Sequence, residues 1–77
     1  IFLIFIFFIT VAIAKIDLNS ATKKQLMSLD GIGEVKAEAI IEYRERYGKI
    51  YSIEELININ GIGKKTIENI KGDVLLE

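Results

Sequence analysis

The sequence has no cysteine and no histidine among its 77 residues. Without cysteine, the chain can form no disulfide, no thiolate metal site and no cysteine nucleophile. Without histidine, it has no imidazole for acid–base chemistry and no Ser-His-Asp triad. These two absences exclude the enzyme classes that depend on either side chain.

Charge is also absent from one end of the chain. Residues 1–14 are apolar except for Thr10, so all 10 basic and 11 acidic residues lie in residues 15–77. The formal net charge of −1 and the hydrophobic fraction of 51% are therefore averages over two unlike parts. We expect an apolar segment over residues 1–14 and one small domain over residues 15–77.

The apolar segment is shorter than the stretch of about 18–20 residues that spans a bilayer. It ends in Ala12-Ile13-Ala14, a small-x-small pattern that precedes a signal-peptidase cut. The chain begins with Ile1 rather than Met, so we expect residues upstream of it. Three interpretations stay open: the core of a cleaved secretory signal, an uncleaved membrane anchor, or a buried strand. The first two predict an extracytoplasmic domain, either periplasmic or membrane-anchored and facing outward.

The domain contains an internal repeat with an offset of thirty residues. Leu26–Gly33 aligns with Leu56–Gly63, and both segments end in Gly-Ile-Gly. The apolar spacing continues after each of these turns. So short a unit cannot close a core alone, whereas two packed copies can.

The periodicity predicts a helix, a tight turn and a second helix in each copy, and no β-strand. The predicted fold class is all-α, with the two repeats packed as a small bundle. In the first copy we expect a helix over residues 21–28, capped by Asn19 or Ser20, and a longer helix over Glu34–Tyr47 that ends at Gly48.

In the second copy, Ser52 and Glu55 fit a capping box in which the Ser52 side chain accepts from the Glu55 amide. That helix is predicted to end near Asn58, and the last helix to cover residues 64–71. Residues 74–76 are expected to fold back on the core. In the long helix, the spacing predicts an inward face made of Ala37, Ile40, Tyr43 and Tyr47. It also predicts a separate acidic stripe made of Glu34, Glu38, Glu42 and Glu45.

Each Gly-Ile-Gly turn opens directly into a helix. The first amides of a helix lack internal partners and carry partial positive charge, and glycine lets an anion approach the backbone. The two turns are therefore candidate phosphate sites, with Ile32 and Ile62 pointing inward and Lys36, Lys64 and Lys65 nearby. A single such turn is usually only a connector, but two copies in register favour binding.

Other polar and aromatic residues have plainer interpretations. Each lysine can be merely solvated, and the acidic stripe fits a solvent-facing surface better than a catalytic pair. We interpret Tyr43, Tyr47 and Tyr51 as core or rim residues rather than as a base-stacking platform.

Most of the domain resembles a tandem helix-hairpin-helix domain, and closely the ComEA-like competence DNA-binding proteins. The matching segments are Ile16–Thr22, Leu29–Ala37, Ile40–Arg44, Gly48, Ser52–Leu56 and Gly61–Thr66. Together they extend over about residues 15–71.

The resemblance implies sequence-independent binding of double-stranded DNA from the minor-groove side, with backbone amides of each hairpin holding phosphates. It implies no enzyme activity, no cofactor and no metal, and a role outside the membrane in DNA uptake. A membrane uptake channel and further copies along the duplex are the implied partners. The site residues carried over are Gly31, Ile32, Gly33, Val35, Lys36, Gly61, Ile62, Gly63, Lys64 and Lys65.

Two features depart from that family. Asp30 precedes the first turn where proline is common, and a capping role for Asp30 would keep its carboxylate away from a phosphate. The net charge of −1 is low for a DNA-binding protein, so we expect weak binding per domain. Two alternatives stay open: a protein-interaction module, as in extrinsic photosystem subunits or exporter-associated domains, and a nuclease fragment.

Overall fold

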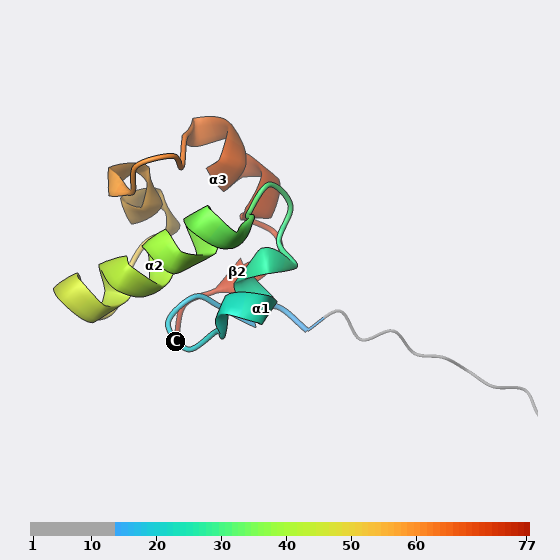
Figure 1. The fold of residues 1–77 in the computed structure, drawn as a ribbon. Coiled ribbons are helices and arrows are strands. Elements are labelled where there is room, and N and C mark those ends of the chain that lie inside the picture. The colour runs from blue at the N-terminus through green and yellow to red at the C-terminus, as the bar shows by residue number, and fades with distance from the viewer. Residues whose placement is uncertain (1–13) are drawn as a thin grey trace, which may run out of the picture.

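The computed structural model describes residues 14–77 of the chain, and it is mostly helical (Figure 1). Almost all of the predicted apolar segment lies outside the described residues. No helix within the described part is long and apolar enough to cross a membrane. The element order is β1 (Ile16–Asp17), α1 (Lys23–Met27), α2 (Glu34–Tyr47), the 3-10 helix η1 (Ile53–Asn58), α3 (Lys64–Ile70) and β2 (Val74–Leu75).

The core confirms that the repeat governs the packing. Matched positions of the two copies are buried together, such as Leu26 with Leu56 and Ile40 with Ile70. No polar or charged side chain among residues 14–77 is buried. The full set of buried side chains is Leu18, Ala21, Leu26, Leu29, Ile32, Ala37, Ile40, Ile50, Leu56, Ile59, Ile62, Ile67, Ile70 and Val74.

The first helix starts later than predicted. Its N-cap is Thr22, whose hydroxyl accepts from the Gln25 amide while the Gln25 side chain accepts from the Thr22 amide. This capping box fixes the helix start at Lys23. The prediction of a start at residue 21 capped by Asn19 or Ser20 is therefore wrong.

Asn19 instead connects three parts of the chain. Its Oδ1 accepts from the Ile50 amide at 2.7 Å, and its Nδ2 donates to the Ile50 carbonyl at 3.0 Å. The same Nδ2 donates to the Glu77 carbonyl at 3.1 Å. This side chain thereby holds the loop after α2 against both ends of the domain.

The long helix α2 has the predicted bounds. It ends at Gly48, which has a φ of 81°, a conformation that favours glycine. Ala37 and Ile40 are buried as expected and Tyr43 is partly buried, but Tyr47 is 66% exposed. The predicted inward face is thus wrong for Tyr47, because α2 extends past the core at this end.

The next element has the predicted position but not the predicted hydrogen bonds. The Ser52 hydroxyl accepts from the Glu54 amide, and the Glu55 carboxylate accepts from the Tyr51 amide. These partners replace the predicted reciprocal pair. The segment is a 3-10 helix, a tighter form that is common in short pieces.

A short parallel strand pair joins the two ends of the domain, which corrects the prediction of no β-strand. Ile16 pairs with Val74, and Asp17 with Leu75. The Ile16 amide donates to the Asp73 carbonyl at 2.9 Å, and the Leu18 amide to the Leu75 carbonyl at 3.1 Å. Two-residue strands are too short to show an alternating pattern in the sequence. The expectation that residues 74–76 fold back on the core is confirmed for Val74, which is buried.

Candidate nucleic-acid interface

The first Gly-Ile-Gly turn is held by backbone hydrogen bonds on both sides. The Ile32 amide donates to the Leu29 carbonyl at 3.1 Å, and the Ala37 amide to the Gly33 carbonyl at 2.9 Å. Gly31 has a φ of 78°, which an L side chain rarely adopts. Glycine at this position is therefore required by the turn itself.

The second turn repeats this geometry thirty residues later. The Ile62 amide donates to the Ile59 carbonyl at 3.0 Å, and the Ile67 amide to the Gly63 carbonyl at 3.2 Å. Gly61 has a φ of 93°, close to that of Gly31. Ile32 and Ile62 are both buried, so the prediction that they point inward is confirmed.

The second glycine of each turn has a different role. Gly33 and Gly63 are the N-caps of α2 and α3, with φ of −92° and −105°, which other residues also adopt. Neither helix has a side chain that caps its first amides. A Cβ added at either glycine would meet no atom within 4 Å. These positions are open to solvent, and a group from outside can approach the backbone there.

The amides beyond each N-cap point at this opening. The first intrahelical donors are Ala37 and Ile67, so the amides of the three preceding residues in each helix have no backbone acceptor within the described chain. Such amides form a ready site for an anion. The residues concerned are Glu34, Val35 and Lys36 in α2, and Lys64, Lys65 and Thr66 in α3.

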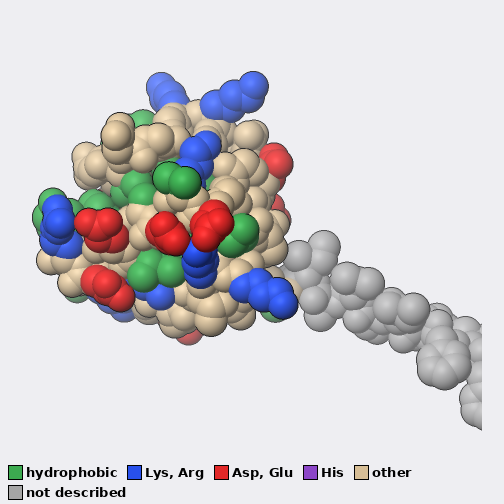
Figure 2. Space-filling view, in the orientation of Figure 1, with side chains coloured by type: hydrophobic (Ala, Val, Ile, Leu, Met, Phe, Trp, Pro, Cys, Tyr) green, Lys and Arg blue, Asp and Glu red, His purple; other side chains and the backbone are tan. Residues whose placement is uncertain are grey.

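The predicted lysines lie at the turns, in different ways. The Lys36 Nζ donates to the Gly31 carbonyl at 3.2 Å, so this side chain folds over the first turn. Lys64 and Lys65 are exposed at the start of α3, and neither forms an ion pair within residues 14–77. Figure 2 shows Lys and Arg side chains projecting from the top of the molecule, where Figure 1 places α3.

Acidic residues make the first turn less positive than the second. Glu34 occupies the place of Lys64, and the Lys23 Nζ lies 2.7 Å from carboxylate oxygens of both Glu34 and Glu38. The hydrogen bonds that Lys23 donates to these two carboxylates raise the pKa of Lys23, and the one to Glu34 lowers the pKa of Glu34. Lys23 thus offsets the charge of Glu34, whose counterpart in the second copy is the basic Lys64, and of Glu38, whose counterpart is also acidic, Glu68.

Asp30 does not cap the following helix. Its side chain is exposed, and the N-cap of α2 is Gly33, with no side-chain hydrogen bond. The capping role suggested for Asp30 is therefore wrong. The equivalent residue of the second turn is the neutral Asn60.

The two turns lie close together. A Cβ added at Gly31 would lie 4.0 Å from Cγ2 of Thr66, in the first turn of α3. Figure 1 shows the loop before α2 running beside α3. Val35, at the start of α2, is 79% exposed although it is apolar. The first turn thus lies beside the start of α3.

Comparison with known proteins decides the family of this fold. The pattern of the family described as helix-hairpin-helix motif matches residues 11–75. The chain belongs to the helix-hairpin-helix family. Within it, the chain is similar to ComE operon protein 1 of Bacillus subtilis, to which it is 41% identical over 64 residues. That match covers 83% of this chain and 31% of the relative.

Other relatives share this helix-hairpin-helix region. An uncharacterised protein of Haemophilus influenzae is 42% identical over 62 residues, which are 79% of this chain and 55% of the relative. Endonuclease/exonuclease/phosphatase family domain-containing protein 1 of Rattus norvegicus is 35% identical over 63 residues, which are 82% of this chain but only 11% of the relative. The chain thus spans between a tenth and about half of these relatives, and the match to the nuclease-family protein covers only its small helix-hairpin-helix part.

No group of three or more Asp, Glu, His or Cys residues within 14–77 could hold a metal ion.

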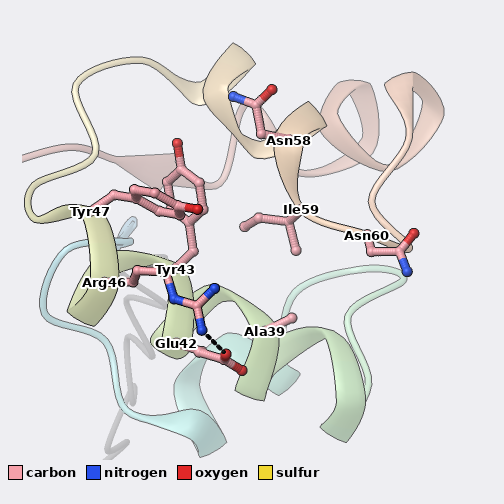
Figure 3. Close-up of a pocket in the computed structure, with 8 residues that line it drawn as sticks. All are labelled: Ala39, Glu42, Tyr43, Arg46, Tyr47, Asn58, Ile59 and Asn60. Atoms are coloured by element: carbon pink, nitrogen blue, oxygen red, sulfur yellow. Dashed lines mark hydrogen bonds and ion pairs between the residues drawn. The ribbon is translucent and has the colours of Figure 1, made fainter.

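The helix-hairpin-helix domain contains a feature that was not predicted from the sequence. A groove of about 270 Å³ lies between α2 and the segment leading into the second turn (Figure 3). Its lining residues come from α2 and from residues 58–60.

Proposed function

We propose that this chain binds double-stranded DNA through its phosphates, without sequence preference and without catalysis. One observation carries the proposal: two matched glycine turns present uncapped amides and open backbone. Amides at a helix start hold phosphate oxygens without needing many cationic side chains. A contact made through the backbone carries no information on base sequence.

The low net charge fits this mode of binding. The chain has 10 basic and 11 acidic residues, so it has no strong general attraction for DNA. At the second turn, however, Lys64 and Lys65 lie beside the open amides without acidic partners in the described chain. We therefore expect loose binding by a single domain, with the second turn contributing more than the first.

The biological setting follows from the family. The similarity to ComE operon protein 1 and to ComEA-like competence proteins supports a role in DNA uptake. We propose that the domain works outside the cytoplasmic membrane, delivered or anchored by the apolar residues 1–14. A membrane uptake channel would then be its partner. Several copies on one duplex, or copies held at a membrane, would raise retention through avidity.

The turns can be tested without changing charge or fold. Serine at positions 33 and 63 would place a hydroxyl where it caps the uncapped amides, and serine is a preferred N-cap residue. The double variant Gly33→Ser/Gly63→Ser should fold with unchanged or higher stability. Its affinity for a random duplex at low salt should fall by about tenfold, because the amides are occupied and the open space is filled.

Gly72→Ser is the matched control, because Gly72 also has open space around it but lies after α3, away from the turns. The control should bind DNA as the unchanged chain does. If the double variant also binds like the unchanged chain, the turns are not the contact. If the unchanged chain binds no duplex at low salt, DNA binding itself is refuted.

The location can be tested separately. A reporter enzyme that is active only outside the cytoplasm can be fused after residue 77 in a bacterial host. The proposal expects reporter activity that disappears when residues 1–14 are removed. Activity confined to a reporter that works only inside the cytoplasm would contradict it.

A second candidate function is a protein-interaction module. A cleft of about 420 Å³ between η1 and α3 has Ile57 and Ile67 among its lining residues, and Ile57 is 52% exposed. Apolar surface of this kind is typical of protein contacts. An Ile57→Gln variant separates the two functions, since it adds no charge beside Lys64 and should leave DNA binding intact while abolishing capture of a protein partner.

A further inference from the structure

Four of the eight residues that line the groove between α2 and the second turn lie in an extension of α2 that α3 lacks. The helix α3 ends at Ile70, which matches Ile40 in the repeat, whereas α2 continues to Tyr47. These additional turns of α2 contribute Glu42, Tyr43, Arg46 and Tyr47 to the groove. The other lining residues are Ala39, Asn58, Ile59 and Asn60.

The groove has an aromatic side, an apolar floor and amide groups. The rings of Tyr43 and Tyr47 have centroids 4.9 Å apart and are tilted by 49°. Figure 3 shows the two rings at the left, Ile59 near the middle, Ala39 on α2 below it, and Asn58 and Asn60 at the top and the right with their amides directed away from the rings. A planar ring system would find a stacking face beside apolar surface within one small site.

The charges of the groove cancel. The Arg46 Nη2 lies 3.2 Å from the Glu42 carboxylate, and both side chains are more than 60% exposed. A phosphate entering the groove would meet a carboxylate together with the guanidinium, so it gains little net attraction. A neutral group that can stack is favoured over a charged one.

The position of the groove connects it with the DNA surface. Asn60 lines the groove and directly precedes Gly61, the first glycine of the second turn. A nucleotide next to a phosphate held at that turn therefore lies within reach of the groove. A base paired in a duplex shows only its edges in the grooves of DNA, so a base that stacks on a protein ring must be unpaired.

We propose that this groove binds an unpaired nucleobase, so that the domain prefers DNA with a single-stranded segment beside the duplex. Tyr47 supplies the stacking face, because its ring is 66% exposed while Tyr43 is partly buried and donates to Glu55 at 3.4 Å. The groove volume of about 270 Å³ lies near the lower end of ligand pockets, which suits one ring system. This inference rests on the proposed DNA binding and assigns Tyr47 a stacking role that the sequence had not favoured.

The test compares two DNA probes with the full chain. One is a blunt random duplex, and the other is the same duplex with a short oligothymidine tail. Fluorescence anisotropy at one fixed salt concentration should give roughly tenfold tighter binding to the tailed duplex, since one stacked base contributes that much. The Tyr47→Ala variant should lose this preference and bind the blunt duplex unchanged, while Tyr47→Trp should keep it.

Tyr51→Ala is the matched control, because Tyr51 is also a strongly exposed tyrosine, at 77%, but does not line the groove. It should keep the preference for the tail. Photocrosslinking of a 5-iodouracil tail should mark Tyr47 or Tyr43, as mapped by mass spectrometry.

The outcomes distinguish failure of the groove assignment from failure of the proposed DNA binding. Equal binding of both probes by a chain that binds the blunt duplex overturns the groove assignment alone. Loss of the preference in Tyr51→Ala but not in Tyr47→Ala also overturns it. A chain that binds neither probe at low salt refutes the proposed function. A groove that captures a peptide but leaves the two DNA probes indistinguishable would assign it to a protein partner instead.

Discussion

At the scale of single residues, the two glycines of each turn have separate physical roles. Gly31 and Gly61 have positive φ and are required by the backbone, whereas Gly33 and Gly63 have ordinary φ and open surroundings. The sequence alone could not distinguish the two roles, because all four positions are glycine and differ only in backbone conformation. Only the conformation shows which glycine the turn needs and which one a ligand would need.

Another residue-scale feature is a carboxylate that organises the ends of the domain. Asp17 accepts from the Ser20 hydroxyl at 2.7 Å, from the Asn19 amide at 3.0 Å and from the Glu77 amide at 3.2 Å. Burial raises the pKa of Asp17, but these hydrogen bonds and Lys49 outweigh it and leave the pKa below 3.8. The charged form is therefore favoured by folding.

This shift predicts an acid-sensitive contribution to stability. Because the folded-state pKa of Asp17 is lowered, its stabilising effect is present at pH values above the ordinary 3.8 and is lost as the pH falls through the lowered pKa. Asp17→Asn should lower stability at neutral pH and reduce the loss on acidification. Urea unfolding at neutral and acidic pH measures this. Asp30→Asn is the control, and an equal effect from it would assign the acid sensitivity elsewhere.

At the scale of elements, the repeat made most of the helical core predictable. Leu26, Leu29 and Ile32 recur as Leu56, Ile59 and Ile62, and all six are buried. The start of α1 was missed because the side chains of Asn19 and Ser20, which could cap a helix, bond elsewhere. Asn19 accepts from the Ile50 amide, and Ser20 donates to the Asp17 carboxylate. The strand pair was missed because its partners are almost sixty residues apart and each strand has two residues.

The position of the candidate site was predictable from the sequence, but the difference in charge between its two turns was not. Gly-Ile-Gly and the neighbouring lysines located both turns. The pairing of Lys23 with Glu34 and Glu38 joins α1 to α2 across a loop, and no local spacing indicates it. The groove beside the second turn was missed because its residues come from two segments that meet only in the fold.

The charge difference between the turns predicts unequal contributions to DNA binding. Lys64→Gln/Lys65→Gln should weaken binding to all duplex sequences alike and reduce the steepness of the salt dependence by about two. Lys24→Gln is the control, because Lys24 is exposed on α1 and lies outside the turns. Binding titrations over a range of salt concentrations measure both effects. A change in sequence preference, or an equal loss in the control, would contradict the assignment.

At the scale of the whole molecule, the two turns should act together on one duplex. With the three lysines of the turns each neutralising one phosphate, the logarithm of the binding constant should fall with the logarithm of the salt concentration with a slope of about −3. Titrations with a random duplex measure this slope. A slope near zero would mean that phosphates contribute little, and a slope near −1 would mean that a single contact dominates.

The parallel pairing of β1 with β2 has a mechanical consequence when the two ends of the domain are pulled apart. The strand that leads into the domain and the strand that leaves it lie side by side and run in the same direction. A pull on the incoming end of β1 against the outgoing end of β2 therefore loads the Ile16–Val74 and Asp17–Leu75 pairs in shear rather than peeling them one at a time. A pull between the two ends of the domain would therefore load this short strand pair before it loads the two hairpins.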